Sequence, residues 1–234
     1  MIKNVLIFVG GYGKRLGNLT KKTPKPLLLI NNKPFVNYLL DKIIKIKPKK
    51  IIFLCKYKNS QFLEKYNKKK INKTYISCLV ESKKLGTGGS LFNAKKYITN
   101  NTLILNGDTF FNINFDKFNK VFLKKHLMFM CLVKNKLYKS NKKLSQLNVK
   151  KKMVVFSKKN SNLMNSGFYV TNKKIIKFLK KNNNSLEKEI IPNLIQKKLI
   201  SGKIFNNDHI DIGTKKNFKY FCNYSKNIKN NFKL

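Results

Sequence analysis

Arginine and acidic residues are scarce in this chain. Arg15 is the only arginine, so 51 of the 52 basic residues are lysine, and only nine residues are acidic. The resulting formal charge of +43 would favour a nucleic acid or an anionic membrane as partner if the lysines were clustered. Instead, lysines occur in nearly every ten-residue block together with many asparagines, as in proteins encoded by AT-rich genes. We interpret the charge as compositional background that still attracts anionic substrates.

Cysteines are few, and long apolar segments are missing. The four cysteines show no CxxC spacing, and we expect them to be free thiols in a reducing compartment. The apolar run Val5–Val9 is too short for a signal-peptide core, and no stretch approaches the roughly 20 apolar residues of a membrane helix. We therefore expect a cytoplasmic protein without a membrane partner. A homodimer is compatible with the sequence, which does not determine the oligomeric state.

The apolar pattern alternates between strands and helices in the first half of the chain. Expected strands there are 2–9, 50–55, 74–80 and 102–105, and expected helices are 34–46, 61–66, 85–97 and 115–124. The second half predicts strands at 127–133, 144–149, 153–156, 164–170 and 199–205, and helices at 175–181 and 186–196. This order predicts an α/β fold with a Rossmann-like, mostly parallel sheet flanked by helices and a small β-rich part that binds the acceptor. We expect one domain over 1–224 and a flexible tail over 225–234.

A glycine-rich loop follows the first expected strand, with the sequence Gly-Gly-Tyr-Gly-Lys-Arg-Leu over residues 10–16, and Pro-Lys-Pro follows at 24–26. A Rossmann fingerprint needs a glycine where Leu16 stands, and the Gly-Lys-Ser/Thr of a Walker loop is absent. We interpret the segment as a backbone cradle for a triphosphate, in which Arg15 and Lys25 supply positive charge for the leaving pyrophosphate. A structural turn would explain the glycines alone. It would not explain Arg15, whose planar guanidinium binds phosphate oxygens with two donors.

Two of the nine acidic residues stand near glycine at expected loop positions. Asp108 follows the strand at 102–105, and Asp211 begins the sequence Asp-Ile-Gly-Thr. Because ligands bind at the carboxyl ends of strands in an open α/β sheet, Asp108 and the first glycine loop can face one site. Mg²⁺ takes carboxylate oxygens together with substrate phosphates, so the two aspartates predict a magnesium site. A turn-forming aspartate is the alternative for each of them.

Taken in order, these motifs resemble the sugar-1-phosphate nucleotidyltransferase family over about residues 1–220. The family signature is Gly-Gly-x-Gly-x-Arg-Leu followed by Pro-Lys-Pro. The similarity continues through residues 81–89, 106–108, 165–169, 185–187 and 211–214. Within the family, the chain is most similar to the short bacterial enzymes of the D-glycero-α-D-manno-heptose 1-phosphate guanylyltransferase type. The resemblance implies a glycosyltransferase-A-like nucleotidyltransferase fold.

The resemblance also implies three groups of site residues. The catalytic cations would be Arg15 and Lys25, and Asp108 and Asp211 would hold Mg²⁺. The nucleotide-binding positions are Gly10, Gly11, Gly13, Lys14, Glu81, Gly86, Thr87 and Gly88. The sugar-phosphate-binding positions are Lys159, Asn165, Gly167 and Glu187.

Several of these positions leave the substrate open. Glu81 could accept hydrogen bonds from guanine, but such a glutamate also occurs in relatives that use other bases. Glu187 could simply belong to the first turn of a helix capped by Ser185. Lys158 stands where the family has a sugar-binding glutamate, and Lys139 stands where it has a glycine. These two departures weaken the assignment of the sugar.

The expected reaction joins a nucleoside triphosphate, with GTP favoured, to a sugar 1-phosphate of the heptose or mannose type. It releases pyrophosphate and gives a nucleotide sugar for surface polysaccharide synthesis, as in lipopolysaccharide or capsule. The attacking phosphate oxygen is already anionic, so catalysis requires positioning and charge neutralisation rather than a nucleophilic side chain. One alternative is a thymidylyl-, uridylyl- or cytidylyltransferase acting on a hexose 1-phosphate. Another is a catalytically weakened, basic relative that binds nucleic acid.

Overall fold

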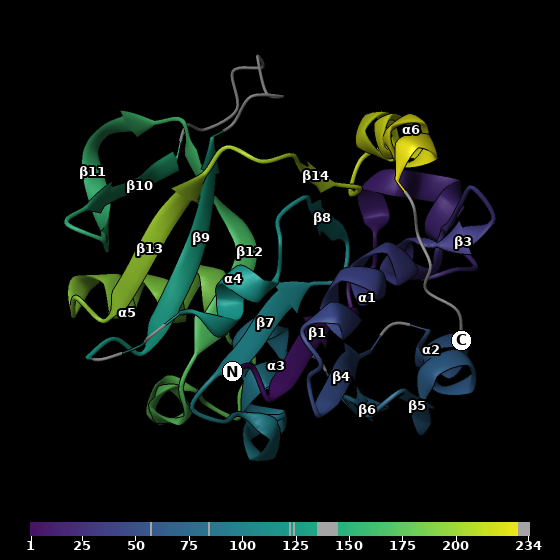
Figure 1. Ribbon diagram of the computed structural model, residues 1–234, viewed down its shortest axis with the longest axis horizontal. Helices are drawn as coiled ribbons and strands as arrows, with labels where there is room; N and C mark the ends of the chain where they lie inside the picture. Colours follow the sequence, from purple (N-terminus) through teal and green to yellow (C-terminus); the bar gives the residue numbers. More distant parts are fainter. Residues whose placement is uncertain (57, 84, 122, 124, 135–144, 229–234) are drawn as a thin grey trace. The chain divides into compact units, whose positions relative to one another are not determined.

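The computed structural model describes residues 1–56, 58–83, 85–121, 123, 125–134 and 145–228 (Figure 1). The chain forms two compact units. Unit 1 comprises Met1–Lys84, Leu105–Lys120 and Asp208–Leu234, and unit 2 comprises Leu85–Ile104 and Val121–Asn207. Strand β7 (Thr102–Asn106) contains one of the boundaries between them in the sequence. Among the described residues, none of the helices has the length and apolar character needed to cross a lipid bilayer.

Unit 1 contains four neighbouring strands of the main sheet. These strands, in spatial order, are β1 (Asn4–Phe8), β4 (Lys50–Cys55), β6 (Thr74–Val80) and β5 (Lys69–Ile71). The first three run parallel, with Phe8 opposite Leu54 and Leu54 opposite Leu79, and β5 adds an antiparallel edge. The apolar runs at 5–7 and 51–53 are fully buried, as expected for central parallel strands.

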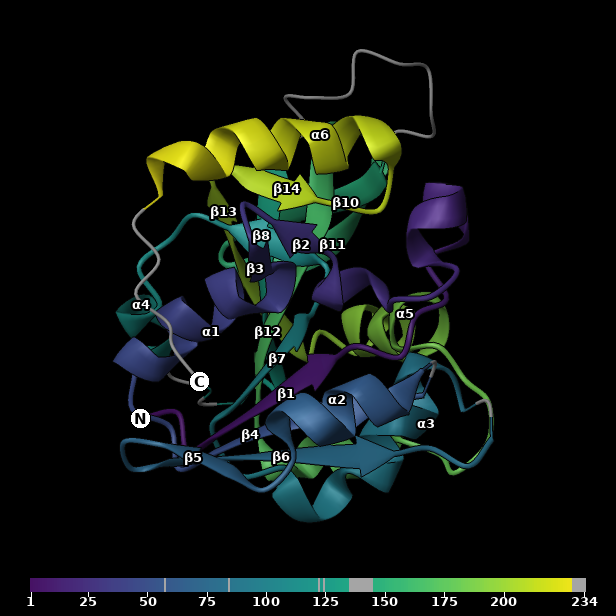
Figure 2. The ribbon, with the colours of Figure 1, turned by 90° about the vertical axis from the view of Figure 1, so that its right-hand side faces the viewer.

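Helices α1 (Phe35–Lys45) and α2 (Asn59–Tyr66) connect these parallel strands. In α1, which matches the helix expected at 34–46, the buried apolar residues form one face of the helix and are Phe35, Val36, Leu39, Leu40 and Ile43. Figure 2 shows α2 lying over β6. The buried hydroxyl of Tyr66 in α2 donates to Oδ1 of Asn37 in α1 at 2.7 Å, so the two helices share a hydrogen bond in the core. A short hairpin of β2 (Leu29–Ile30) and β3 (Lys33–Pro34) precedes α1.

Several elements of unit 1 differ from the sequence prediction. Strand β8 (Thr109–Phe111) pairs with β14 (His209–Asp211), so Asp211 ends a strand where a loop was expected. Helix α6 (Lys215–Tyr224) was not predicted, and it lies over β14 (Figure 2). The predicted helix at 115–124 was wrong in length, because α4 covers only Asp116–Asn119.

Unit 2 contains five neighbouring strands of mixed direction, which confirms the predicted β-rich half. These strands, in spatial order, are β10 (Ser145–Lys150), β11 (Met153–Ser161), β13 (Ile200–Phe205), β9 (Met128–Lys134) and β12 (Leu163–Thr171). Only β13 and β9 run parallel, and the other neighbours are antiparallel. Helix α5 (Ile191–Gln196) packs against β11 and β13 (Figure 1).

The predicted helices of unit 2 are correct in place but differ in type. The helix expected at 85–97 is α3 (Gly86–Asn93) followed by the 3-10 turn η3 (Lys95–Tyr97), and the one at 175–181 is the 3-10 helix η4 (Lys173–Phe178). The segment 186–196 begins as a π-helical turn, η5 (Leu186–Ile190), and continues as α5. Pro192 accounts for this change, since its ring cannot approach the carbonyl four residues earlier and widens the preceding turn.

Candidate functional site

The first glycine loop starts at the carboxyl end of β1 in unit 1. The N–H of Val9 donates to the carbonyl of Leu54 at 3.2 Å, and the chain then leaves the sheet. Gly11 is exposed, and a Cβ built on it meets no heavy atom within 4 Å. Lys14 is exposed as well. The loop therefore presents its backbone to open space, as a phosphate cradle requires.

Thr20, which the sequence analysis did not select, closes this loop. Its hydroxyl lies 3.1 Å from the carbonyl of Gly13 and 3.2 Å from that of Gly17. Both glycines have positive φ, 65° and 59°, which few other residues adopt. The 3-10 helix η1 (Lys14–Thr20) carries Arg15, whose side chain is 65% exposed. Thr20 thus fixes the loop, and the guanidinium stays accessible.

Strands β8 and β14 bring Asp108 and Asp211 together within unit 1. Thr109 pairs with Asp211 in the antiparallel ladder, and the N–H of Ile212 donates to the carbonyl of Asp108 at 3.0 Å. Burial, together with the nearby charge of Asp108, raises the pKa of the Asp211 carboxyl. A cation beside both carboxylates would remove this repulsion, so the pair fits a divalent metal ion.

Lys25 and Arg15 each face one of these carboxylates. Nζ of Lys25 lies 2.5 Å from Oδ2 of Asp108, and Lys25 is only 8% exposed. It begins the 3-10 turn η2 (Lys25–Leu27), and a proline on each side restricts its backbone. Nη2 of Arg15 lies 3.7 Å from Oδ2 of Asp211. Both cations counteract the rise in the pKa of Asp211, and the four side chains lie together in one cluster.

Gly213 gives Arg15 the room to approach Asp211. The N–H of Gly213 donates to Oδ1 of Asp211 at 2.7 Å. A Cβ on Gly213 would lie 2.7 Å from Nη2 of Arg15 and 2.8 Å from Oδ1 of Asp211, which is closer than real Cβ atoms come. Thr214 then caps α6 by accepting from the N–H of Asn217 at 3.2 Å. The Asp-Ile-Gly-Thr motif therefore orients the carboxylate, leaves space beside it and starts a helix.

Within the described ranges, no group of three or more histidine, cysteine or acidic side chains could hold a metal ion. A cation at Asp108 and Asp211 would need further oxygen ligands from water or a bound phosphate. This donor chemistry is the one that Mg²⁺ uses with phosphate substrates.

Glu81 lies at the same sheet edge of unit 1 as the first glycine loop. Cys55 and Val80 are opposite each other at the ends of β4 and β6, and the N–H of Glu81 donates to the carbonyl of Cys55 at 2.9 Å. Since β1, β4 and β6 are parallel, their carboxyl ends share one edge. The role of Glu81 in base recognition stays a prediction.

The second glycine loop packs against residues 182–184 within unit 2. A Cβ on Gly86 would overlap the carbonyl oxygen of Asn184, and Gly86 has a φ of 67°. A Cβ on Gly88 would overlap Oδ1 of Asn184, a buried atom that has no hydrogen-bond partner among the described residues. A Cβ on Gly89 would lie 2.5 Å from the carbonyl oxygen of Asn182. The packing of the protein itself therefore requires these glycines, against backbone at Gly86 and Gly89 and against the Asn184 side chain at Gly88.

Thr87 of this loop contacts Glu187. Its hydroxyl donates to Oε2 of Glu187 at 2.6 Å and accepts from the N–H of Leu186 at 2.8 Å. Ser185 caps η5 by accepting from the N–H of Lys188, so Glu187 does stand in the first turn of a capped helix. The carboxylate of Glu187 also points toward Thr87, so the capped turn and the second glycine loop meet at this side chain.

Asn165, Gly167 and Glu187 lie around Tyr169, which the sequence analysis did not select as a site residue. Nδ2 of Asn165 donates to the Tyr169 hydroxyl at 2.6 Å, and Oδ1 of Asn165 accepts from the N–H of Gly167 at 2.9 Å. Tyr169 is fully buried, and its pKa is raised by burial and then by the charge of Glu187. Asn165 and Gly167 thus lie beside Tyr169, and the charge of Glu187 acts on the same tyrosine.

Lys159, the fourth predicted sugar-phosphate position, has different surroundings within unit 2. It is exposed and lines an open hollow of about 870 Å³, whose lining also includes Lys134, Lys150 and Phe156. Asn165, Gly167 and Glu187 are not among the residues that line this hollow. The side chain of Lys158 and the whole of Lys139 lie outside the described residues.

Comparison with known proteins connects this geometry to a family. The sequence profile described as nucleotidyl transferase matches residues 4–225. The D-glycero-alpha-D-manno-heptose 1-phosphate guanylyltransferase of Campylobacter jejuni is 29% identical over 221 residues, which cover 92% of this chain and 97% of that protein. The mannose-1-phosphate guanylyltransferase catalytic subunit beta of Xenopus tropicalis is 29% identical over 239 residues, which cover 96% of this chain and 65% of that protein.

A solved structure extends the comparison. HddC from Yersinia pseudotuberculosis matches with a TM-score of 0.79 and 25% identity over 95% of this chain and 99% of that one. The same protein complexed with GMP-PN matches with a TM-score of 0.76. These similarities confirm the predicted fold class, a mostly parallel sheet flanked by helices as in nucleotidyltransferases of the glycosyltransferase-A-like fold.

Proposed function

The chain belongs to the nucleotidyl transferase family, and from this premise we propose that it transfers a guanylyl group from GTP to a sugar 1-phosphate of the heptose or mannose type. The guanylyltransferase relatives and the GMP-PN complex of HddC support the choice of nucleotide and sugar. The products are a nucleotide sugar and pyrophosphate. We assign the nucleotide sugar to surface polysaccharide synthesis, in lipopolysaccharide or capsule.

The cluster of Arg15, Lys25, Asp108 and Asp211 in unit 1 is the observation that carries this proposal. In the reaction, an oxygen of the sugar 1-phosphate forms a bond to the α-phosphorus of GTP, and the bond from that phosphorus to the bridging oxygen breaks. The attacking oxygen is already anionic, so no side chain has to remove a proton. Negative charge develops on the departing pyrophosphate, and cations held in place beforehand stabilise it.

The two cations suit different parts of this reaction. Arg15 is mostly exposed on the loop, and its guanidinium can bind two oxygens of the leaving pyrophosphate. Lys25 is buried and held by Asp108, so it is a fixed charge for the transferring phosphoryl group. In this proposal Gly10, Gly11, Gly13 and Lys14 surround the nucleotide phosphates.

Mg²⁺ is part of the proposal, with Asp108 and Asp211 as its protein ligands. When bound, the ion would neutralise phosphate oxygens and align them. The raised pKa of Asp211 supports this assignment, because burial beside a second carboxylate leaves its charge poorly compensated.

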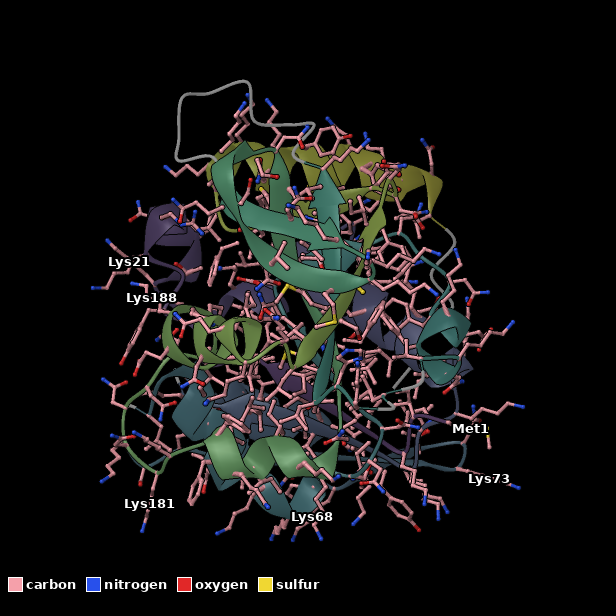
Figure 3. All side chains as sticks on the ribbon, turned by 90° about the vertical axis from the view of Figure 1, so that its left-hand side faces the viewer. Met1, Lys21, Lys68, Lys73, Lys181 and Lys188 are labelled. Carbon is pink, nitrogen blue, oxygen red and sulfur yellow. The ribbon has the colours of Figure 1, made fainter. Side chains whose placement is uncertain are left out.

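The high charge and the location belong to the same proposal. The lysines labelled in Figure 3, among them Lys21, Lys68, Lys73 and Lys188, come from several segments of the chain and point away from the ribbon. This arrangement supports compositional background over a nucleic-acid surface. The four cysteines are free thiols, which is compatible with the cytoplasmic location expected from the sequence.

A substrate matrix tests the function. Pyrophosphate release is measured for GTP, ATP, CTP, UTP and dTTP with heptose, mannose and glucose 1-phosphates in the presence of Mg²⁺. We expect turnover with GTP and a heptose or mannose phosphate, loss of turnover in Asp108→Ala, and wild-type turnover in Asp116→Ala, which removes an exposed acid of α4. An active Asp108→Ala variant would contradict the metal assignment. Salt-dependent retention on DNA without any turnover would favour the nucleic-acid alternative.

A further inference from the structure

Glu187 receives two hydroxyl groups on one carboxylate oxygen. The hydroxyl of Thr87 donates to Oε2 at 2.6 Å, and the hydroxyl of Ser185 lies 3.1 Å from the same atom. All three residues belong to unit 2, but Thr87 is about a hundred residues away in the sequence. The contact therefore links the second glycine loop to the predicted sugar-phosphate residues.

We propose that Thr87 is a positioning residue for the acceptor sugar rather than a nucleotide contact. Its hydroxyl holds the Glu187 carboxylate in the orientation in which that carboxylate accepts hydrogen bonds from the hydroxyl groups of the sugar 1-phosphate. This inference rests on the proposed function, and it changes the role that the sequence assigned to Thr87.

The hydrogen-bonding capacity of Thr87 supports this role. A threonine hydroxyl has one hydrogen to donate, and in Thr87 that hydrogen goes to a carboxylate in a short, charge-assisted bond. A lone pair of the same oxygen accepts from the N–H of Leu186 at 2.8 Å. A nucleotide would have to displace a strong bond before Thr87 could donate to it.

The geometry of Glu187 leaves one oxygen for a substrate. Thr87 and Ser185 both bind Oε2, so neither of them uses Oε1. Glu187 is half-buried, and its charge reaches Tyr169, whose hydroxyl accepts from Asn165. Sugar hydroxyls need acceptors, and lysine cannot provide one. In a chain with only nine acidic residues, this is one of few carboxylates that can.

The backbone around Thr87 is fixed independently of any ligand. The N–H of Gly88 donates to the carbonyl of Asn184, and the N–H of Asn184 donates to the carbonyl of Leu85, each at 3.0 Å. The missing Cβ atoms of Gly86 and Gly88 allow this close approach. Because backbone contacts hold the loop in place, the Thr87 hydroxyl is a fixed donor for the Glu187 carboxylate.

The test replaces Thr87 by valine, which keeps the shape and removes the hydroxyl. We expect Thr87→Val to raise the KM for the sugar 1-phosphate by about tenfold or more, the size of one charge-assisted hydrogen bond, and to leave the KM for GTP unchanged. Thr87→Ser restores the hydroxyl and should restore the wild-type KM. Thr99→Val is the matched control, because Thr99 is half-buried in the same unit, where its hydroxyl lies 3.1 Å from that of Thr102. It should change neither KM.

Other outcomes overturn the inference in distinct ways. A higher KM for GTP alone would make Thr87 a nucleotide contact, and a fall in activity that Thr87→Ser does not restore would make its role structural. Binding of the sugar 1-phosphate, measured by calorimetry without GTP, gives a readout besides turnover. If wild-type protein turns over and Thr87→Val binds the sugar phosphate equally well, only this inference fails. If the wild type neither turns over nor binds a sugar phosphate, the proposed function fails as well.

Discussion

Replacing Gly86 by alanine should destabilise the protein even in the absence of any ligand. Gly86 has a φ of 67°, and a Cβ there would overlap the carbonyl oxygen of Asn184 and lie 2.9 Å from its carbonyl carbon. The main chain of residues 182–184 cannot turn away as a flexible side chain could. To make room, the loop and this segment must separate.

The cost follows from two contributions. An alanine in the left-handed region costs about 1–2 kcal/mol. Separation of the segments breaks the two 3.0 Å backbone hydrogen bonds, Gly88 to Asn184 and Asn184 to Leu85, which contribute about 1 kcal/mol each. We therefore expect a loss of about 3–4 kcal/mol, or roughly 6–16 °C in Tm for a chain of this size.

Thermal unfolding followed by circular dichroism, with no nucleotide or sugar present, measures this loss. Gly11→Ala is the matched control, because Gly11 is exposed and its Cβ would meet nothing within 4 Å. It should change Tm by less than about 2 °C, as for most surface substitutions. Pyrophosphate release by Gly11→Ala should nevertheless fall, because the new methyl group points into space that the nucleotide is proposed to use. Equal Tm values for Gly86→Ala and the wild type would refute the reasoning.

Two predictions concern the charged cluster. Burial and the charge of Asp108 raise the pKa of Asp211 in the folded protein above the ordinary value of 3.8. The folded protein therefore loses stability as the pH rises from 3.8 through this raised pKa, because Asp211 must then ionise while buried beside Asp108. At pH 7 without Mg²⁺, Asp211→Asn should therefore have a higher Tm than the wild type, and this difference should vanish below pH 3.8. Mg²⁺ should raise the Tm of the wild type only. A lower Tm of Asp211→Asn than of the wild type at pH 7 would contradict the assignment. Arg15→Lys keeps the charge but loses the two-donor geometry, so kcat/KM should fall by about 100-fold in the pyrophosphate assay, whereas Lys21→Arg should have no effect.

The strands of unit 1 show what the sequence could predict. The limits of β4 and β6 match the predicted ranges residue for residue, because apolar, β-branched runs bounded by polar turns are typical of buried parallel strands. Helix α6 was missed because lysine and asparagine surround its aromatic residues, as they do in the tail that follows. Its stability comes from contacts distant in the sequence, such as the ring of Phe221 at 5.0 Å from Phe35 and 5.1 Å from Phe110.

The sequence selected the residues of the charged cluster but not the contacts between them. The order of the motifs selected Arg15, Lys25, Asp108 and Asp211, and the structure places these four side chains together. Nothing in the sequence indicated that Lys25 binds Asp108 or that Thr20 closes the first loop. Such pairings depend on short elements that come together from distant parts of the sequence, such as the β8–β14 ladder, whose strands are too short to give a periodic signal.

The two glycine loops illustrate a limit of motif analysis. The sequence treats Gly11 and Gly86 alike, as glycines in loops that follow expected strands. In the structure, the side-chain position of Gly11 is open, whereas that of Gly86 is filled by the backbone of Asn184. A missing Cβ can therefore make room for a ligand or for the protein itself, and only the atoms around it distinguish the two. Because the second loop uses its glycines to pack against the segment before Glu187, its functional group is the Thr87 hydroxyl that this packing holds in place.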